Sequence, residues 1–566
     1  MAAGTDRYDR LSIVSGSPLS EESGIGALTL GGYLREVTER FGPREALAVR
    51  AGDRMIRWSY DALWEQTRAV AQALLACGVG KGTRVGVLAT NRLEFLSCVF
   101  GTALAGGVAA TLSTFSTPAE LQFLLSQSAC SVLLLERHVL NKDFAAMLAG
   151  IEPQISTVQP GRLASLKFPF LRHLAVIDGD EAYGAIEGWA PFLSRGAKVA
   201  PALVDATASA VAPSDPGVLF FSSGSTGKPK GILSAHRAVC IQLWRYPQVF
   251  GFGDDIRCLP ANGFAWSGNF VQGIGGTLSV GGTIVLQRIF DPRDSLDLMV
   301  RERVNYPIAW PHQWAQIEAV PGFAEADLSA MRYVGMQTPI GKHPTVKSNW
   351  HEPVRIYGNT ETFTISTALF GGASPEAYGE SSGRPLPGNT IRIVDTDTGA
   401  TVPWGEQGEI AVKGPTLMLG YIGIPTDETL DDRGFFRTGD GGYLDEQGRL
   451  VWQGRLNDII KTGGANVSPV EIDNIIKTMP GVKATQTVGV PDEMLGELVV
   501  ACIVPQDGVQ LDAAAVCSFV KLQLASYKVP RRVLFFSEGE FTVTGNAKIK
   551  AGDVRKLAME RLMENT

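Results

Sequence analysis

The sequence lacks the cysteine and histidine spacings that hold metal ions or disulfide frameworks. Its seven cysteines are scattered, odd in number and mostly set among apolar residues, and no C-x-x-C or H-x-x-x-H pair occurs. Structural zinc sites need closely spaced ligands, and disulfide-rich secreted folds need paired cysteines. These absences argue against both classes and indicate a reduced protein.

The sequence also shows neither the pattern of a signal peptide nor an excess of positive charge. Residues 1–16 hold no apolar core of signal-peptide length, which predicts a cytoplasmic protein. With 51 Lys and Arg against 58 Asp and Glu, the formal net charge is −7, which argues against nucleic acid as a partner. The uncharged stretch 95–119 is long enough to span a bilayer. Its glycines and its late proline instead favour a buried helix to about Ala105, a Gly-Gly turn and a strand at 108–110, and so no membrane span.

The chain does contain enough apolar sequence for more than one domain. Its 566 residues are 45% hydrophobic and 19% charged, and they exceed the roughly 250–300 residues at which one hydrophobic core stops growing. Helical and strand patterns alternate in the N-terminal part, where Ser59 is placed to cap a helix that ends near Gly78. Such alternation is typical of βαβ units and parallel sheets. Buried strands are expected at 85–88, 132–135, 174–178, 282–287 and 355–357.

The pattern changes beyond Gly383. Short alternating segments at 391–394 and 408–412 predict an antiparallel β region. After Gly454 a smaller unit begins. Its expected elements are helices at 469–479 and 512–524 and strands at 485–490 and 498–504.

A glycine- and serine-rich loop is the most informative local feature. The apolar run 218–221 predicts a buried strand that delivers this loop. Glycine tolerates the positive φ values that let a loop aim backbone N–H groups at an anion. The spacing differs from a Walker A loop, which needs G-x-x-x-x-G-K-[ST]. The residues predicted to bind polyphosphate are Ser222, Ser223, Gly224, Ser225, Thr226, Gly227, Lys228 and Lys230.

This loop resembles the phosphate-binding signature of the adenylate-forming superfamily. That group contains acyl-CoA synthetases, adenylation domains of nonribosomal peptide synthetases, and luciferases. Further motifs follow in the family's order between about Leu30 and Leu557: Y-G-N-T-E at 357–361, R-T-G-D at 437–440, G-R-L-N-D-I-I-K at 454–461 and T-G-N-A-K at 544–548.

The resemblance implies roles for the motif residues in binding MgATP. The Tyr357 ring would stack near adenine, the Thr360 hydroxyl would reach a phosphate, and Glu361 would hold Mg²⁺, which prefers carboxylate oxygens. Asp440 would accept hydrogen bonds from the ribose hydroxyls. Gly358, Asn359 and Arg455 would also approach the nucleotide, as would the loop of Gly335, Met336 and Gln337, although this loop departs from the usual G-G-A-P.

The C-terminal motifs imply a mobile lid. Asn457 would be the hinge, although most members carry Asp or Lys there. Lys548 would bridge the carboxylate and the α-phosphate, with Lys550 as the alternative, because Asn546 and Ala547 stand where a glycine usually precedes the lysine. Together with Thr226 and Glu361, Lys548 makes up the predicted catalytic set. After lid rotation the site would gain Lys461, Gly463, Gly464 and Asn466, with Gly464 beside the pantetheine arm of coenzyme A.

The expected acid pocket lies at 260–268. Amino-acid-activating members hold an aspartate where this chain has Ala265, so a substrate ammonium would be left without a partner in a desolvated pocket. Phe264, Trp266 and Gly268 therefore predict a pocket for an apolar aryl or aliphatic acid, unless both aromatics are simply core residues.

The sequence thus predicts an α/β enzyme with a large N-terminal body of two α/β subdomains and a β region (1–453) and a small α+β lid (454–566). It would use ATP, Mg²⁺ and coenzyme A to convert a carboxylic acid into acyl-AMP and then acyl-CoA. Two alternative acceptors stay open: an amine, as in an amide synthetase, or a separate carrier protein. A degenerate nucleotide-binding regulator is disfavoured because Glu361, Asp440, Arg455 and Lys548 are all present.

Overall fold

The computed structural model describes residues 10–222, 229–353, 355–371, 373–462, 465–492, 495–524, 528–541, 549 and 551–564. The chain forms two compact units. The large unit comprises Ser15–Thr390 and Val412–Phe436, and the small unit comprises Met1–Val14, Ile391–Ala411 and Arg437–Thr566. The predicted α/β class, with a large body and a small C-terminal domain, is confirmed. The boundary expected between residues 453 and 454 stays a prediction.

An eight-stranded sheet forms the centre of the large unit, in the order β10-β9-β6-β4-β5-β11-β12-β20. The strands from β10 to β11 are parallel, and β12 and β20 are antiparallel to their neighbours. Parallel strands are covered on both faces, which is why their sequences are continuous apolar runs. The strands are β4 Arg84–Leu88, β5 Val108–Leu112, β6 Val132–Leu135, β9 His173–Val176, β10 Ile186–Glu187, β11 Pro216–Ser222, β12 Lys230–Ala235 and β20 Gly420–Tyr421.

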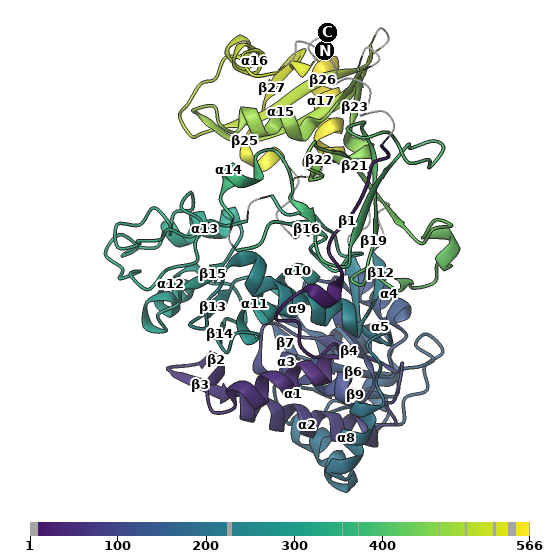
Figure 1. The fold of residues 1–566 in the computed structure, drawn as a ribbon. Helices are drawn as coiled ribbons and strands as arrows, with labels where there is room; N and C mark the ends of the chain where they lie inside the picture. Colours follow the sequence, from purple (N-terminus) through teal and green to yellow (C-terminus); the bar gives the residue numbers. More distant parts are fainter. Residues whose placement is uncertain are drawn as a thin grey trace. The chain divides into compact units, whose positions relative to one another are not determined.

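Helices cover both faces of this sheet (Figure 1). Val132 and Leu134 of β6 belong to the core formed with α1, α2, α3 and α9, whereas Leu133 and Leu135 belong to the core formed with α4 and α5. This split follows from the alternation of side chains along a strand. Ser59 caps α2 as predicted, because its hydroxyl accepts from the Ala62 N–H at 3.1 Å. The helices are α1 Leu30–Phe41, α2 Tyr60–Ala76, α3 Leu93–Leu104, α4 Pro118–Ser128, α5 Phe144–Ile151 and α9 His236–Phe250.

The uncharged stretch 95–119 forms most of α3, a turn and β5, as predicted, and it ends in the first residues of α4. Gly106 makes the turn with φ of +77°. Across the described residues, no helix is both long enough and apolar enough to cross a membrane. The cytoplasmic location stays a prediction.

A five-stranded sheet, in the order β15-β13-β14-β2-β3, completes the large unit. β13 pairs in parallel with both β14 and β15. The loops that follow these strands therefore leave from one edge of the sheet. The elements are β2 Glu45–Ala51, β3 Arg54–Ser59, β13 Arg257–Pro260, β14 Thr283–Leu286, β15 Tyr306–Ile308, α10 Ser267–Phe270, a π-helical turn Val271–Gly275, α11 Gly276–Leu278, α12 Pro292–Arg301 and α13 Pro311–Glu318.

The prediction of a strand at 355–357 is wrong. Among the described residues of this segment, Tyr357 alone forms a bridge, with Thr367. The chain turns at once after Tyr357, and a Cβ at Gly358 would lie 1.7 Å from the Thr364 carbonyl oxygen. Phe363 and Thr364 then adopt positive φ values of 48° and 84°, which extended strands do not contain.

The small unit holds two further five-stranded sheets. The first has the order β1-β18-β19-β21-β22, and the second has the order β24-β23-β26-β25, with β27 paired to β26. Along β26, Val499, Ala501 and Ile503 pack with α15 and α16, whereas Val500 and Cys502 pack with α17. Both faces of the second sheet are thus covered.

The elements predicted after residue 383 are confirmed. The strands of the small unit are β1 Ile13–Ser15, β18 Thr390–Val394, β19 Gly408–Lys413, β21 Phe436–Leu444, β22 Leu450–Arg455, β23 Ile460–Thr462, β24 Ala465–Val467, β25 Val482–Asp492, β26 Gly496–Pro505 and β27 Arg532–Phe535. Its helices are α15 Pro469–Ile476, α16 Ala513–Lys521 and α17 Ala551–Glu564. Short elements elsewhere are α6 Gln154–Thr157, α7 Trp189–Ser194, α8 Pro201–Ser209, α14 Pro375–Tyr378, β7 His138–Val139, β8 Lys142–Asp143, β16 Thr367–Ala368 and β17 Arg384–Pro385.

Candidate functional site

The predicted phosphate loop connects β11 to β12. Ser222 at the end of β11 pairs with Lys230 at the start of β12, so the two strands form an antiparallel hairpin within the central sheet. The intervening predicted residues, Ser223, Gly224, Ser225, Thr226, Gly227 and Lys228, lie outside the described part of the chain.

Lys230 and Glu361 both contact the side chain of one tyrosine, Tyr421. Tyr421 of β20 pairs with Ile232 of β12, next to the hairpin. Its O–H donates to Glu361 Oε1 at 2.8 Å, and Lys230 Nζ lies 4.9 Å from the centroid of its ring. The Met418 N–H also donates to the Glu361 carbonyl oxygen at 2.7 Å. The structure therefore brings together one predicted phosphate ligand and the predicted metal ligand.

The Y-G-N-T-E turn places Glu361 by its backbone conformation. Tyr357 is buried. The Asn359 side-chain oxygen accepts from the Thr362 N–H at 2.9 Å, and the Asn359 N–H donates to the Thr362 hydroxyl at 3.2 Å. These two bonds close the turn around Thr360 and Glu361. The positive φ values at Phe363 and Thr364 are strained conformations of the kind that gather at functional sites.

A metal held by Glu361 would need most of its ligands from elsewhere. Among the described residues, no group of three or more His, Cys, Asp and Glu side chains is arranged to hold a metal ion. Mg²⁺ at nucleotide sites is usually bound by one or two carboxylates, with substrate phosphates and water as the other ligands. A single carboxylate that Tyr421 orients near Lys230 fits that pattern.

The predicted adenine-facing loop is a closed turn. The Thr338 N–H and hydroxyl both donate to the Gly335 carbonyl oxygen, at 3.0 and 2.7 Å. Met336 and Gln337 at the tip are exposed, which is the state a nucleotide-contacting loop needs.

A cavity of about 140 Å³ opens beside this turn and includes Gly335 in its wall. It lies where the loops after β13 and β15 come together. Its polar wall includes Asn262, Asn269, Gln272 and Tyr306, and its apolar wall includes Ile308 and Trp314.

The four predicted substrate residues lie next to the cavity wall and do not line it. Phe264 is buried against Phe95, with ring centroids 5.7 Å apart. Trp266 stacks on Phe115 at 6.0 Å. The Ala265 carbonyl oxygen accepts from the Thr111 hydroxyl at 3.4 Å. The fourth, Gly268, has no atom within 4 Å of the position that a Cβ would occupy.

Sequence reasoning missed Asn269 and Gln272, which lie three residues apart on the helical segment that begins at Ser267. The i, i+3 spacing of two amides on a helix was the available signal. It also missed Asn91, which follows β4 and fixes the neighbouring loop. Asn91 Nδ2 donates to the Asn262 carbonyl oxygen at 2.9 Å, and its side-chain oxygen accepts from the Phe264 N–H at 3.0 Å.

The small unit contains the predicted ribose ligand. Asp440 of β21 is buried and pairs across the sheet with Arg455 of β22. Arg455 Nε lies 3.1 Å from Asp440 Oδ1, and the Arg455 guanidinium also donates to the Thr438 carbonyl oxygen at 2.9 Å. The arginine therefore holds the carboxylate in position.

The predicted hinge and lid residues follow β22 in the sequence. Asn457 lies in the 3₁₀ turn Leu456–Asp458. Lys461 of β23 is exposed and pairs with Asn466 of β24. Gly463, Gly464 and Lys548 lie outside the described residues.

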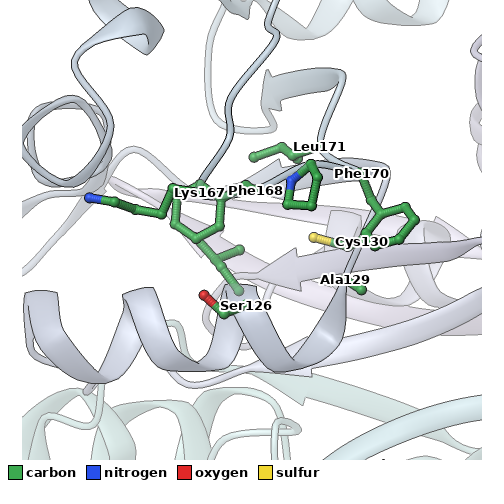
Figure 2. Close-up of a pocket in the computed structure, with 9 residues that line it drawn as sticks. Ser126, Ala129, Cys130, Lys167, Phe168, Phe170 and Leu171 are labelled. Atoms are coloured by element: carbon green, nitrogen blue, oxygen red, sulfur yellow. The ribbon is translucent and has the colours of Figure 1, made fainter.

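A second cavity, of about 60 Å³, lies between α4 and residues 167–171 (Figure 2). Its wall includes Cys130 and Phe168. Figure 2 shows the Lys167 amino group pointing away from Cys130, and this group donates to the Ile151 carbonyl oxygen at 2.6 Å. None of the motif residues lines this cavity, so it has no part in the predicted site.

Comparisons with known proteins agree with the motifs. The AMP-binding enzyme family matches residues 34–422, and the AMP-binding enzyme C-terminal domain matches residues 471–548. The chain is 30% identical over 516 residues to indoleacetate–CoA ligase of Aromatoleum aromaticum, covering 90% of this chain and 95% of the relative. It is 29% identical over 541 residues to the mitochondrial medium-chain acyl-CoA ligase of Bos taurus, covering 91% and 86%.

Among known structures, that of an amide bond synthetase from Marinactinospora thermotolerans matches with a TM-score of 0.72 at 25% identity, covering 94% of this chain and 99% of that one. The family match spans more than half of the chain, and both relatives align over nearly their whole length. The chain therefore belongs to the AMP-binding enzyme family, the adenylate-forming enzymes that its motifs resemble.

Proposed function

We propose that the chain is an AMP-forming acid–thiol ligase that activates an apolar carboxylic acid with ATP and transfers the acyl group to coenzyme A. The observation that carries this proposal is the cavity whose wall includes Gly335 of the predicted adenine-facing turn. An acid bound in this cavity would lie next to a nucleotide bound at the turn. The two relatives are named for a medium-chain acid and for indoleacetate, both acids with an apolar body.

The first step joins the acid to the nucleotide. A carboxylate oxygen attacks the α-phosphorus of ATP, the bond from that phosphorus to the bridging oxygen breaks, and pyrophosphate leaves. Catalysis consists of positioning and electrostatic stabilisation, because no covalent protein intermediate is needed. The phosphate loop and Lys230 would hold the β- and γ-phosphates, and Lys548 would neutralise charge that develops at the α-phosphate.

Three side chains of the large unit would support this step. The Tyr421 hydroxyl orients the Glu361 carboxylate, and the Tyr421 ring faces the Lys230 ammonium. Mg²⁺ bound at Glu361 would supply positive charge to the phosphates. In the small unit, Asp440 would accept from the ribose hydroxyls while Arg455 keeps its carboxylate in place.

The second step transfers the acyl group. The thiolate of coenzyme A attacks the acyl carbonyl carbon, and AMP leaves with the oxygen that came from the acid. The resemblance assigns this step to a second orientation of the lid, 454–566, reached about Asn457. Lys461, Gly463, Gly464 and Asn466 would then contact the nucleotide and the pantetheine arm.

Product analysis tests the proposal. The purified protein is incubated with MgATP, coenzyme A and medium-chain or aryl acids, and AMP, pyrophosphate and acyl-CoA are quantified. Equal amounts of all three products are expected. If the acid is adenylated but no acyl-CoA forms at any coenzyme A concentration, the acceptor assignment fails, and an amine and a carrier protein are added in turn to the same reaction.

A further inference from the structure

The acid cavity contains a glutamate that the adenylation chemistry does not use. Glu352 lines this cavity together with Trp350, two residues earlier in the chain. Trp350 is fixed by an indole N–H bond to the Phe250 carbonyl oxygen at 2.7 Å and by ring contacts with Phe252 and Tyr333. A fixed Trp350 therefore anchors the segment that carries Glu352.

No cation faces this carboxylate from the cavity wall. The wall contains neither lysine nor arginine nor histidine. The structure gives no hydrogen bond or ion pair to the Glu352 side chain from any residue that it describes. The Glu352 side chain is exposed to solvent, yet desolvation by its surroundings raises the pKa of the carboxyl above its usual value. An occupant that displaces this solvent must therefore replace the hydrogen bonds of the carboxyl group or leave it unsatisfied.

The two amides nearby also offer acceptors to an occupant. Gln272 Nε2 donates to the Tyr306 hydroxyl at 2.7 Å, and Asn269 Nδ2 donates to the Gly263 carbonyl oxygen at 3.3 Å. These bonds point both amide nitrogens at protein atoms and leave the amide oxygens for an occupant. Glu352 and these two amides line the same cavity as the apolar side chains of Ile308 and Trp314.

We propose that Glu352 is a specificity-determining residue that selects carboxylic acids bearing a hydrogen-bond donor, a hydroxyl or an N–H group, on the part of the molecule remote from the reacting carboxylate. This inference rests on the proposed function and names its substrate class. A plain hydrocarbon acid fills the apolar side of the cavity but leaves the Glu352 carboxyl group without a partner. A dicarboxylic acid is selected against, because its second carboxylate would lie against Glu352 and repel it.

Matched acids test this selection. The pairs are 3-phenylpropanoate with 3-(4-hydroxyphenyl)propanoate and octanoate with 8-hydroxyoctanoate, and octanedioate is the dicarboxylate. Acid-dependent pyrophosphate release gives kcat and KM separately for each. We expect kcat/KM of the hydroxylated acid to exceed that of its plain partner by about 10-fold to 100-fold in at least one pair, the range for a hydrogen bond to a charged group. Octanedioate should be the poorest of the aliphatic acids.

Two variants and one control separate recognition from structure. Glu352→Leu should reverse the preference within the pair, mainly through KM, and Glu352→Gln should retain part of it, because the amide oxygen still accepts. The control is Glu318→Gln on the exposed end of α13, which should leave the ratio unchanged. A ratio near one in the wild type, or a ratio that Glu352→Leu and Glu352→Gln both leave unchanged, overturns the inference.

Failure of the proposed function gives a different result. If no acid releases pyrophosphate, the ligase assignment fails, and calorimetric binding of the same acids decides the inference. Tighter binding of the hydroxylated acid that is lost in Glu352→Leu supports it, and equal binding of both acids by the wild type contradicts it.

Discussion

Removing the Tyr421 hydroxyl should weaken adenylation by acting through Glu361. Tyr421→Phe keeps the ring and so keeps the contact with Lys230 Nζ, 4.9 Å from its centroid. The substitution removes the O–H bond to Glu361 Oε1, 2.8 Å long. The carboxylate then loses its orienting partner, while the backbone bond from Met418 to the Glu361 carbonyl oxygen remains.

The size of the effect follows from the type of bond. A hydrogen bond to a charged group contributes about 1.5–3 kcal/mol. Both side chains are half-buried, so water can replace part of the lost bond, and the lower end of this range applies. About 1.5 kcal/mol corresponds to a decrease of roughly 10-fold in kcat/KM for pyrophosphate release. Glu361→Gln removes the charge itself and should cost about 10²-fold or more, the scale for an aimed electrostatic group.

A double-mutant cycle separates this account from a general loss of structure. The assay is acid-dependent pyrophosphate release over a range of Mg²⁺ concentrations. Tyr421→Phe should raise the Mg²⁺ concentration needed for half-maximal rate, and the double variant should be no slower than Glu361→Gln alone, because residues that act as one unit are not additive. Fully additive effects in the cycle, or an unchanged Mg²⁺ requirement in Tyr421→Phe, would show that the tyrosine does not act through the carboxylate.

Three further predictions concern the lid, the acceptor and acid stability. Lys548→Ala should lower acyl-AMP formation by about 10²–10³-fold but leave thioester formation from supplied acyl-AMP nearly unchanged. Both half-reactions are measured by mass spectrometry, and an equal loss in the two would contradict a lid with two orientations. Gly464→Leu should block thioester formation but leave acyl-AMP formation intact, since the leucine side chain would fill the predicted path of the pantetheine arm. A normal yield of acyl-CoA would show that the arm takes another path. Burial lowers the pKa of His236, whose Nδ1 accepts from the Leu30 N–H at 3.3 Å, to about 4. The neutral ring therefore stabilises the fold above about pH 6.5, and roughly 3 kcal/mol is lost as pH falls from there toward the folded-state pKa. Urea unfolding of His236→Gln should depend less on pH over this interval, and identical slopes for variant and wild type would contradict this origin.

The buried parallel strands were predictable because each one is a continuous apolar run in the sequence. Runs such as Val132–Leu135 are apolar throughout, since α-helices cover both faces of a parallel strand. The strand predicted at 355–357 was wrong because the local sequence does not determine the conformation of this segment. Its residues look like a strand, but the turn at Gly358 and the positive φ values at Phe363 and Thr364 depend on contacts with later residues.

The cavity proposed to bind the acid could not be predicted from any single segment of the sequence. Its wall combines Gln272, Tyr306, Gly335 and Glu352, which come from separate segments of the chain. The resemblance located the neighbouring residues 264–268 but not the side chains that line the cavity one helical turn later. The sequence around Glu352 does not reveal that the cavity wall lacks a cation to pair with it. That property emerges only when the segments meet.

The central claim is that the acid reacts at the α-phosphorus of ATP before the thioester forms. Transfer of ¹⁸O from an acid labelled in both carboxylate oxygens tests it most directly. Attack by the carboxylate followed by thiol displacement leaves one acid-derived oxygen in AMP, so mass spectrometry should find one ¹⁸O atom in each AMP and none in pyrophosphate. Label in inorganic phosphate together with ADP, or unlabelled AMP beside labelled acyl-CoA, would contradict the account.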